Sequence, residues 1–278
     1  MSAAFARCGK RLLHFLLVTG IMLGTALYLI QDRLLHYPEA IAPAAAPDLA
    51  RAERLAPWPD AANPRGWLRE TPQTTRGTVV LFHGNGGHAL HRGWFADAFE
   101  SLGYRTLLAE YPGYGHRSGN TDETTLVAEA ASLIASLRQQ SQSRLILAGE
   151  SLGAGVASAA LAQLARDNGA AGIDAVMLIT PWNDLASVAG HHYPLLPVRL
   201  LLRDRYDSAT NLRRYEGPKL VLVAGDDAII PSPLGRRLFD TLGAHKKLIE
   251  LPGRGHNDWT DAMTAEHWQQ ALAFLEGR

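Results

Sequence analysis

The chain has 278 residues, and its 27 Lys and Arg side chains are balanced by 27 Asp and Glu side chains, so the formal net charge is zero. This balance excludes a typical nucleic-acid-binding protein, because phosphate contacts need a surplus of basic side chains. Hydrophobic residues at 47% and charged residues at 19% exclude a disordered chain, and the single cysteine, Cys8, excludes intramolecular disulfides and cysteine-rich zinc sites.

The first long apolar stretch runs from Leu12 to Ile30 and contains no formally charged side chain. At about 1.5 Å per residue, a helix over this stretch spans roughly 28 Å, close to the ~30 Å hydrocarbon core of a bilayer. Arg7, Lys10 and Arg11 precede it, and basic residues beside a span are retained in the cytoplasm. We therefore expect a cytoplasmic basic tail over residues 1–11, one transmembrane anchor, and a non-cytoplasmic remainder, which is periplasmic in a bacterium with two membranes.

A cleaved signal peptide is the competing interpretation of this stretch, with small residues suited to cleavage at 24–26. The apolar run continues to Ile30, past the point where a cleavage site would end it, which favours an uncleaved anchor. A buried helix of a soluble protein fits least well. Residues 31–64 follow as a connector, and the abundance of Ala and Pro between residues 41 and 62 predicts little regular structure.

Residues 65–278 have the length of one α/β domain. Six apolar runs predict buried strands: Thr78–Phe82, Arg105–Ala109, Leu145–Ala148, Ala175–Thr180, Lys219–Ala224 and Lys247–Leu251. Helical patterns lie between them, and the clearest begins after Asn120, which caps the helix while Glu123 completes a capping box. Its apolar positions form one stripe, at Leu126, Ala130, Leu133, Ile134 and Leu137. This alternation indicates an α/β fold with a mostly parallel sheet, helices on both faces, and active residues at the carboxyl ends of strands.

The sequence Gly149-Glu150-Ser151-Leu152-Gly153 carries the strongest chemical signal. It follows a predicted strand and opens a helix of small residues, which places Ser151 on a tight strand-to-helix turn with an exposed hydroxyl. Glycines two residues before and two residues after leave room for so sharp a turn. We predict that Ser151 is a nucleophile; an ordinary turn serine is the alternative.

A second signal is HGNGG at residues 83–87, directly after another predicted strand. A loop rich in glycine lets backbone N–H groups approach a substrate, so the N–H groups of Asn85 and Leu152 are expected to form an oxyanion hole. His83 and Gly84 support this loop. A phosphate-binding loop is the alternative, but neither the Rossmann spacing nor a Gly-Lys-Ser/Thr ending is present.

The acid and the base follow the last two predicted strands. Asp226 and Asp227 come after one strand, and His256 comes after the other. The chain order is therefore Ser151, Asp227, His256, as in the α/β hydrolases. A serine hydroxyl needs a neutral imidazole to accept its proton, and the imidazole needs a carboxylate to orient it.

The other histidines are assigned no catalytic role. His88 and His91 lie three residues apart on a predicted helix, with no Asp or Glu at metal-ligand spacing, so we expect no metal site. His36, His245 and His267 are expected to be surface or packing residues.

Several motifs together resemble a known family: HGNGG at 83–87, YPGYGHRSG at 111–119, GESLG at 149–153, the D-x-x-x-P of Asp227 to Pro231, and GHND at 255–258. They resemble the membrane-anchored branch of the α/β-hydrolase-domain proteins, which includes lysophospholipid lipases and protein depalmitoylases. The resemblance extends from about Leu34 to the C-terminus. It implies an α/β-hydrolase fold with a minimal cap, and serine-hydrolase chemistry on ester or thioester bonds without metal or cofactor.

Two positions depart from the family pattern. One residue fewer than expected separates Gly225 from Asp227, so Asp226 remains an alternative acid. Arg117 stands where the family often has serine, at the expected entrance of the site.

These observations predict a membrane-tethered serine hydrolase that acts on small acyl esters or thioesters of lipid character, with no nucleic-acid partner. A serine peptidase or amidase on the same fold is an alternative, because no motif separates ester from amide substrates. A hydrolase-fold protein that only binds a ligand is a further alternative, which the presence of Ser151, a candidate acid and His256 disfavours.

Overall fold

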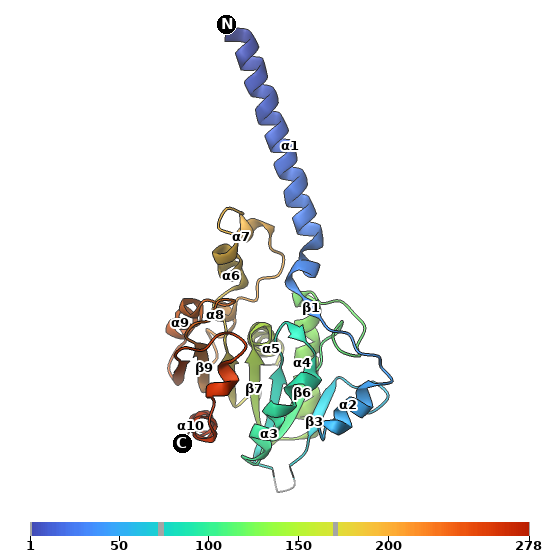
Figure 1. The fold of residues 1–278 in the computed structure, drawn as a ribbon. Coiled ribbons are helices and arrows are strands. Elements are labelled where there is room, and N and C mark those ends of the chain that lie inside the picture. The colour runs from blue at the N-terminus through green and yellow to red at the C-terminus, as the bar shows by residue number, and fades with distance from the viewer. Residues whose placement is uncertain (1, 72–74, 169–171, 278) are drawn as a thin grey trace.

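The computed structural model describes residues 2–71, 75–168 and 172–277, so Met1 and Arg278, the outer ends of the expected tail and domain, lie outside the described residues. The described part forms a central sheet with helices on both faces, and one long helix, α1, projects from it (Figure 1). The predicted α/β architecture is confirmed.

The central sheet has eight strands among the described residues. In sheet order they are β10 (Lys246–Leu251), β9 (Lys219–Ala224), β8 (Ala175–Ile179), β7 (Arg144–Glu150), β4 (Gly77–Phe82), β6 (Arg105–Ala109), β3 (Gly66–Arg69) and β2 (Ala56–Trp58). The pairs from β10 to β6 are parallel, whereas β3 and β2 add in antiparallel fashion. All six predicted strands are present.

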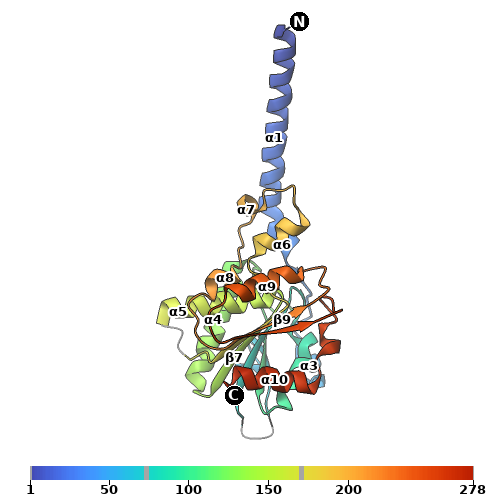
Figure 2. The same ribbon diagram turned by 90° about the vertical axis from the view of Figure 1, so that its left-hand side faces the viewer.

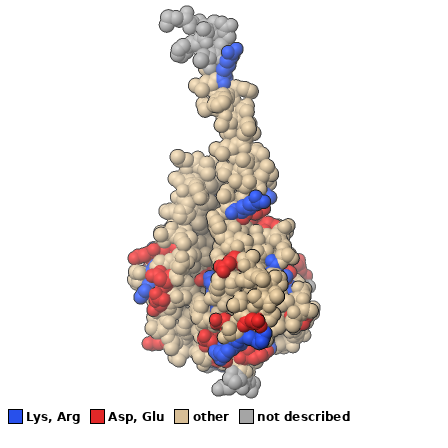
Figure 3. Space-filling model, turned by 45° about the vertical axis from the view of Figure 1, so that its right-hand side comes forward, with Lys and Arg blue, Asp and Glu red and all other residues tan. Residues whose placement is uncertain are grey.

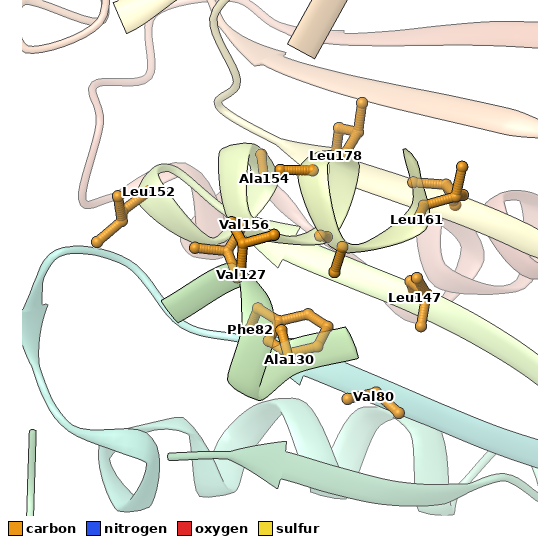
Figure 4. Close-up of a cluster of buried hydrophobic side chains, with 14 of the residues drawn as sticks. Val80, Phe82, Val127, Ala130, Leu147, Leu152, Ala154, Val156, Leu161 and Leu178 are labelled. Atoms are coloured by element: carbon orange, nitrogen blue, oxygen red, sulfur yellow. The ribbon is translucent and has the colours of Figure 1, made fainter. Parts of the chain in front are cut away.

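Alternate residues of each central strand serve two separate hydrophobic cores. In β4, Val80 and Phe82 join one core, and Val79 and Leu81 join the other. The first core lies under α4 (Glu123–Gln140), α5 (Leu152–Asn168) and α9 (Ser232–Thr241), and the second lies under α3 (Gly93–Glu100) and α10 (Ala265–Leu275) (Figure 2). Figure 4 shows side chains of α4 and α5 packed on β4 and β7. Each fully buried aliphatic or Phe side chain contributes about 1.5–3 kcal/mol, so these two layers set the positions of the strand ends.

The segment before residue 65 differs from the irregular connector that its composition predicts. Residues 46–52 form α2 (Ala46–Ala52), with Pro47 in the first turn, where a missing N–H costs no hydrogen bond. β2 contains Pro57, which an edge strand tolerates. The sheet therefore includes a strand upstream of the expected domain start at residue 65.

The start of α4 also corrects a prediction. Its N-cap is Asp122, whose Oδ1 accepts a hydrogen bond from the Thr125 N–H at 2.9 Å, so neither an Asn120 cap nor a capping box through Glu123 forms. The Glu123 carboxylate instead accepts a hydrogen bond from the backbone N–H of Tyr206 at 2.9 Å. The predicted apolar stripe of this helix is buried throughout.

Helix α1 (Ser2–Leu35) extends beyond the apolar run on which the anchor was predicted. Its stretch Gly9–Leu35 has a mean hydropathy of 2.0 and is long and apolar enough to cross a membrane. The chain then forms β1 (Tyr37–Pro38), which pairs in parallel with β5 (Gly86–Gly87). The base of α1 is thereby tied to the HGNGG loop.

The connection from β8 to β9 forms a small cap. Its helices are α6 (Leu185–His192), α7 (Val198–Leu201) and α8 (Ser208–Asn211). Figures 1 and 2 show α6 and α7 on the same side of the domain as the base of α1. The remaining elements are the 3-10 turns η1 (Ala89–Arg92) and η2 (Trp259–Ala262).

Candidate active site

Ser151 occupies the turn between β7 and α5, and its backbone φ is +53°. This left-handed conformation is strained for a residue with a side chain. A Cβ at Gly149 would lie 2.3 Å from the Gly153 carbonyl oxygen, and a Cβ at Gly153 would lie 1.9 Å from the Phe82 carbonyl oxygen. Only glycine fits at both positions, so the backbone holds the serine at one place on the sheet edge.

The structure brings His256 and Asp227 to this serine from two loops at the same edge. The Nε2 atom of His256 lies 2.9 Å from Ser151 Oγ, and its Nδ1 atom lies 2.6 Å from Asp227 Oδ2. All three side chains are largely shielded from solvent. An imidazole between a hydroxyl and a carboxylate can accept the hydroxyl proton while the carboxylate stabilises the resulting positive charge.

The loop after β9 orients the Asp227 carboxylate. Its second oxygen, Oδ1, accepts hydrogen bonds from the N–H groups of Ile229 at 2.9 Å and Ile230 at 2.7 Å. Asp226, the alternative acid, is exposed, and its backbone N–H donates to the Arg254 carbonyl at 2.9 Å. The geometry therefore favours Asp227 as the partner of His256.

The two expected oxyanion donors belong to the residue after Ser151 and to the HGNGG loop. Leu152 is the first residue of α5, where N–H groups have no intrahelical acceptor. Gly84, in the loop before Asn85, lies close enough that a Cβ there would be 3.6 Å from Ser151 Cβ. Within the part of the chain that the structure describes, the N–H groups of Asn85 and Leu152 form no hydrogen bond.

Two tyrosines hold the loop that carries Asn85. The Tyr111 hydroxyl donates to the His83 carbonyl at 2.9 Å, and the Tyr114 hydroxyl donates to Asn85 Oδ1 at 2.9 Å. Burial, reinforced by the nearby Glu110 charge, raises the pKa of both phenols well above the ordinary value, so both remain donors. The sequence analysis included these tyrosines in a motif but did not assign them this role.

The side chains of His83 and Arg117 both form polar contacts within the protein. The His83 ring contacts the Gly84 carbonyl at 2.8 Å and the buried Glu110 carboxylate at 3.1 Å. Arg117, expected at the site entrance, donates to the Glu110 carbonyl and to the Glu129 carboxylate, each at 2.7 Å. Arg117 thus braces the loop after β6.

One group of possible metal ligands among the described residues was not foreseen. Glu39, His88 and His91 each offer a ligand atom, and these atoms lie within 4.8 Å of one another. Pairing of β1 with β5 brings Glu39 beside histidines far from it in the sequence. Glu39 and His91 are exposed, and three such ligands fall short of the four that a structural zinc site takes. The group lies outside the Ser151 site, and no step below uses it.

Comparisons with known proteins find relatives that match much of the chain. The family described as "Serine aminopeptidase, S33" matches residues 73–203. An uncharacterised protein of Mycobacterium tuberculosis is 34% identical over 251 residues, which cover 87% of this chain and 85% of that protein. The lysophosphatidylserine lipase ABHD12 of Danio rerio is 29% identical over 198 residues, 66% of this chain and 51% of the lipase, so the match spans about half of that enzyme.

Solved structures share the fold at low sequence identity. A monoacylglycerol lipase of Paleococcus ferrophilus superposes with a TM-score of 0.56 at 22% identity, over 77% of this chain and 99% of that chain. Est1E of Butyrivibrio proteoclasticus, in complex with ferulic acid, gives 0.60 at 16% identity, over 77% of this chain and 97% of that chain.

Proposed function

Because the chain belongs to the α/β hydrolases, in the branch of the membrane-associated α/β-hydrolase-domain proteins, we propose that it is a serine hydrolase that cleaves acyl esters of lipid character. The observation that carries this proposal is the hydrogen-bonded series Ser151, His256 and Asp227, with contacts of 2.9 and 2.6 Å. The resemblance to named lipases supports an ester substrate.

The proposed reaction has two stages. Ser151 Oγ attacks the acyl carbonyl carbon while His256 Nε2 takes its proton, and the N–H groups of Asn85 and Leu152 stabilise the oxyanion. His256 then protonates the leaving oxygen, which departs as an alcohol and leaves an acyl-enzyme. In the second stage His256 takes a proton from water, which attacks the acyl carbon. The acid departs, and the proton returns to Ser151.

A peptidase or amidase activity is the second candidate, because the matching family is described as a serine aminopeptidase. A thioester is a third substrate class that the same acyl-enzyme would accept. These substrates differ in the leaving atom, whereas the acyl half stays the same.

The experiment that separates them uses purified full-length protein in vesicles and three matched substrates. An ester, a thioester and an amide share one acyl chain, and each is offered at several chain lengths. We expect the ester to have the highest kcat/KM, and longer chains to be preferred. Hydrolysis of the amide at a kcat/KM above that of the ester would favour the peptidase or amidase.

We also propose that α1 anchors the protein, with the basic tail 1–11 in the cytoplasm, residues 12–30 in the bilayer and the hydrolase domain on the other side. The apolar stretch supports the anchor, and the basic residues before it support the orientation. Extraction of the intact protein from membranes by carbonate would contradict the anchor. Protection of the domain from protease in spheroplasts would contradict the orientation.

A further inference from the structure

The segment from the end of α6 to the end of α7, residues 193–201, exposes large apolar side chains. The exposed fraction is 96% for Leu195, 82% for Leu200 and 60% for Tyr193. Neighbouring exposed apolar residues of this size mark a surface that another apolar phase covers.

This segment is attached to α1. The Cδ2 atom of Leu201 lies 3.6 Å from the position that a Cβ at Gly24 would take. Gln31 links the two by donating to the Leu201 carbonyl at 3.2 Å and by accepting from the Arg203 N–H at 2.7 Å. A groove along α1, lined from Leu16 to Tyr28, is completed by Leu201. These contacts define the position of residues 193–201 along the axis of α1.

This position along α1 falls within the apolar run from Leu12 to Ile30. Gly24 precedes Ile30 by six residues, so it lies roughly 9 Å along the helix from the end of the uncharged stretch. Charged residues begin just beyond the apolar run, where Arg203 pairs with Asp32. The Arg203 guanidinium also lies 5.3 Å from the centre of the Tyr28 ring. On the face that Figure 3 shows, no charged residue is visible on α1 between the charged pair at its base and the basic residues near its top.

We infer that residues 193–201 are immersed in the leaflet that α1 enters, and that the partner of this surface is lipid hydrocarbon. The inference rests on the anchor in the proposed function. Arg199, the one charged residue in the segment, lies 3.9 Å from Asp184 and is 72% exposed. Its long stem allows the guanidinium to reach the headgroups.

Immersion has a consequence for the active site. His192, at the end of α6, lies with Nε2 2.8 Å from the Ile229 carbonyl, and the Ile229 N–H donates to the Asp227 carboxylate. The immersed segment is thus continuous with the loop that orients His256. Because the loop that orients His256 lies beside the immersed segment, we expect an acyl substrate to reach the site from the leaflet rather than from water.

The first test measures the depth of single labels. In a Cys8→Ser background, Leu195→Cys and Leu200→Cys carry a nitrobenzoxadiazole label in full-length protein. The vesicles contain phosphatidylcholine with a minor share of phosphatidylglycerol, and part of the lipid bears a nitroxide on its acyl chain. Ile21→Cys on the anchor and the exposed Arg237→Cys on α9 are the reference sites.

We expect labels at 195 and 200 to emit at short wavelength and to be quenched nearly as strongly as the label at 21, whereas the label at 237 stays unquenched. Quenching at 21 without quenching at 195 and 200 would overturn the inference and leave the anchor intact. Absence of quenching at all four positions would overturn the anchor and the inference together.

The second test separates lipid access from chemistry. The double variant Leu195→Asp/Leu200→Asp should hydrolyse a long-chain monoacyl ester in vesicles about tenfold more slowly, because the charged segment no longer enters the leaflet. Its rate on water-soluble p-nitrophenyl butyrate should equal that of the wild type. Leu49→Asp, at an exposed position on α2, is the matched control. Wild-type hydrolysis of the vesicle substrate by the double variant would overturn the inference.

Discussion

Asn85 is joined to Leu35, the last residue of α1, because its side-chain amide donates a hydrogen bond to the Leu35 carbonyl. The other amide atom, Oδ1, accepts from the Tyr37 N–H at 3.0 Å and from the Tyr114 hydroxyl. The residue whose N–H is proposed to bind the oxyanion is therefore held by the base of the proposed anchor.

This relationship predicts the effect of Asn85→Ala, which keeps the backbone N–H but loses all side-chain contacts. Complete loss of one oxyanion donor costs about 10²–10³ in kcat, so a donor that is only less well positioned should cost roughly tenfold. Tyr114→Phe removes one contact of the same side chain and should cost less than Asn85→Ala. Steady-state kinetics on a soluble ester measures both, and a wild-type kcat for Asn85→Ala would contradict the positioning role.

The two neighbouring acids after β9 should behave differently. Asp227→Asn should reduce kcat by about 10⁴, because His256 loses both its orienting acceptor and the charge that stabilises the imidazolium. Asp226→Asn is the matched control and should retain near-wild-type turnover, since this side chain is exposed. The assignment fails if Asp226→Asn is the inactive variant and Asp227→Asn remains active.

Gly153→Ala tests the packing of the nucleophile turn. The added Cβ would lie 1.9 Å from the Phe82 carbonyl oxygen in β4, so α5 and β4 must separate. We expect a loss of about 3 kcal/mol or more in the free energy of unfolding. Gly243→Ala, where a Cβ would meet nothing within 4 Å, should change the free energy by less than about 1 kcal/mol. Urea unfolding of the two variants in detergent compares them, and equal stability would contradict the close contact.

Asp204 should make stability depend on pH. Burial, reinforced by the charges of Glu123, Asp32 and Asp122, raises its pKa to about 6, and its Oδ2 atom lies 4.0 Å from the buried His36 Nε2. In the folded protein, the Asp204 carboxyl group therefore stays protonated at pH values above the ordinary carboxyl pKa. The resulting stabilisation is complete below the unfolded pKa, falls as pH rises, and is lost above about pH 6.

Thermal unfolding at pH 5 and at pH 8 measures this dependence. The wild-type Tm should fall more between these two values than the Tm of Asp204→Asn, because the variant has no carboxyl group to ionise at that position. Equal decreases in Tm for the two proteins would contradict the raised pKa of Asp204.

Local patterns were sufficient to predict much of the fold. The six predicted strands are short, mainly apolar runs; five of them are largely buried, whereas the edge strand β10 is mostly half-buried, which corrects the prediction of burial there. The turn at Ser151 is defined by glycines within two residues of it. Ser151, Asp227 and His256 could be expected to meet because each comes after a strand, and parallel strands end at one edge of the sheet. The strands and the turn depend on residues that are close in the sequence, and the meeting of the three side chains depends on the common edge at which parallel strands end.

The contacts that the sequence did not predict join distant segments of the chain. The bond from Asn85 to Leu35 and the position of Glu39 beside His88 both depend on the short pairing of β1 with β5, which has no periodic signal. The sequence analysis also missed the two antiparallel strands β3 and β2. An edge strand of three residues with a central proline, such as β2, resembles a loop in the sequence.

Covalent labelling tests the central claim most directly. Full-length protein is treated with a fluorophosphonate, which reacts with an activated serine, and the modified residue is located by mass spectrometry. We predict that Ser151 carries the label, and that Ser151→Ala, shown to be folded by circular dichroism, neither binds the probe nor retains ester hydrolysis, with a loss of order 10⁶ in turnover. Wild-type hydrolysis by Ser151→Ala, or labelling of another serine in its place, would contradict the account.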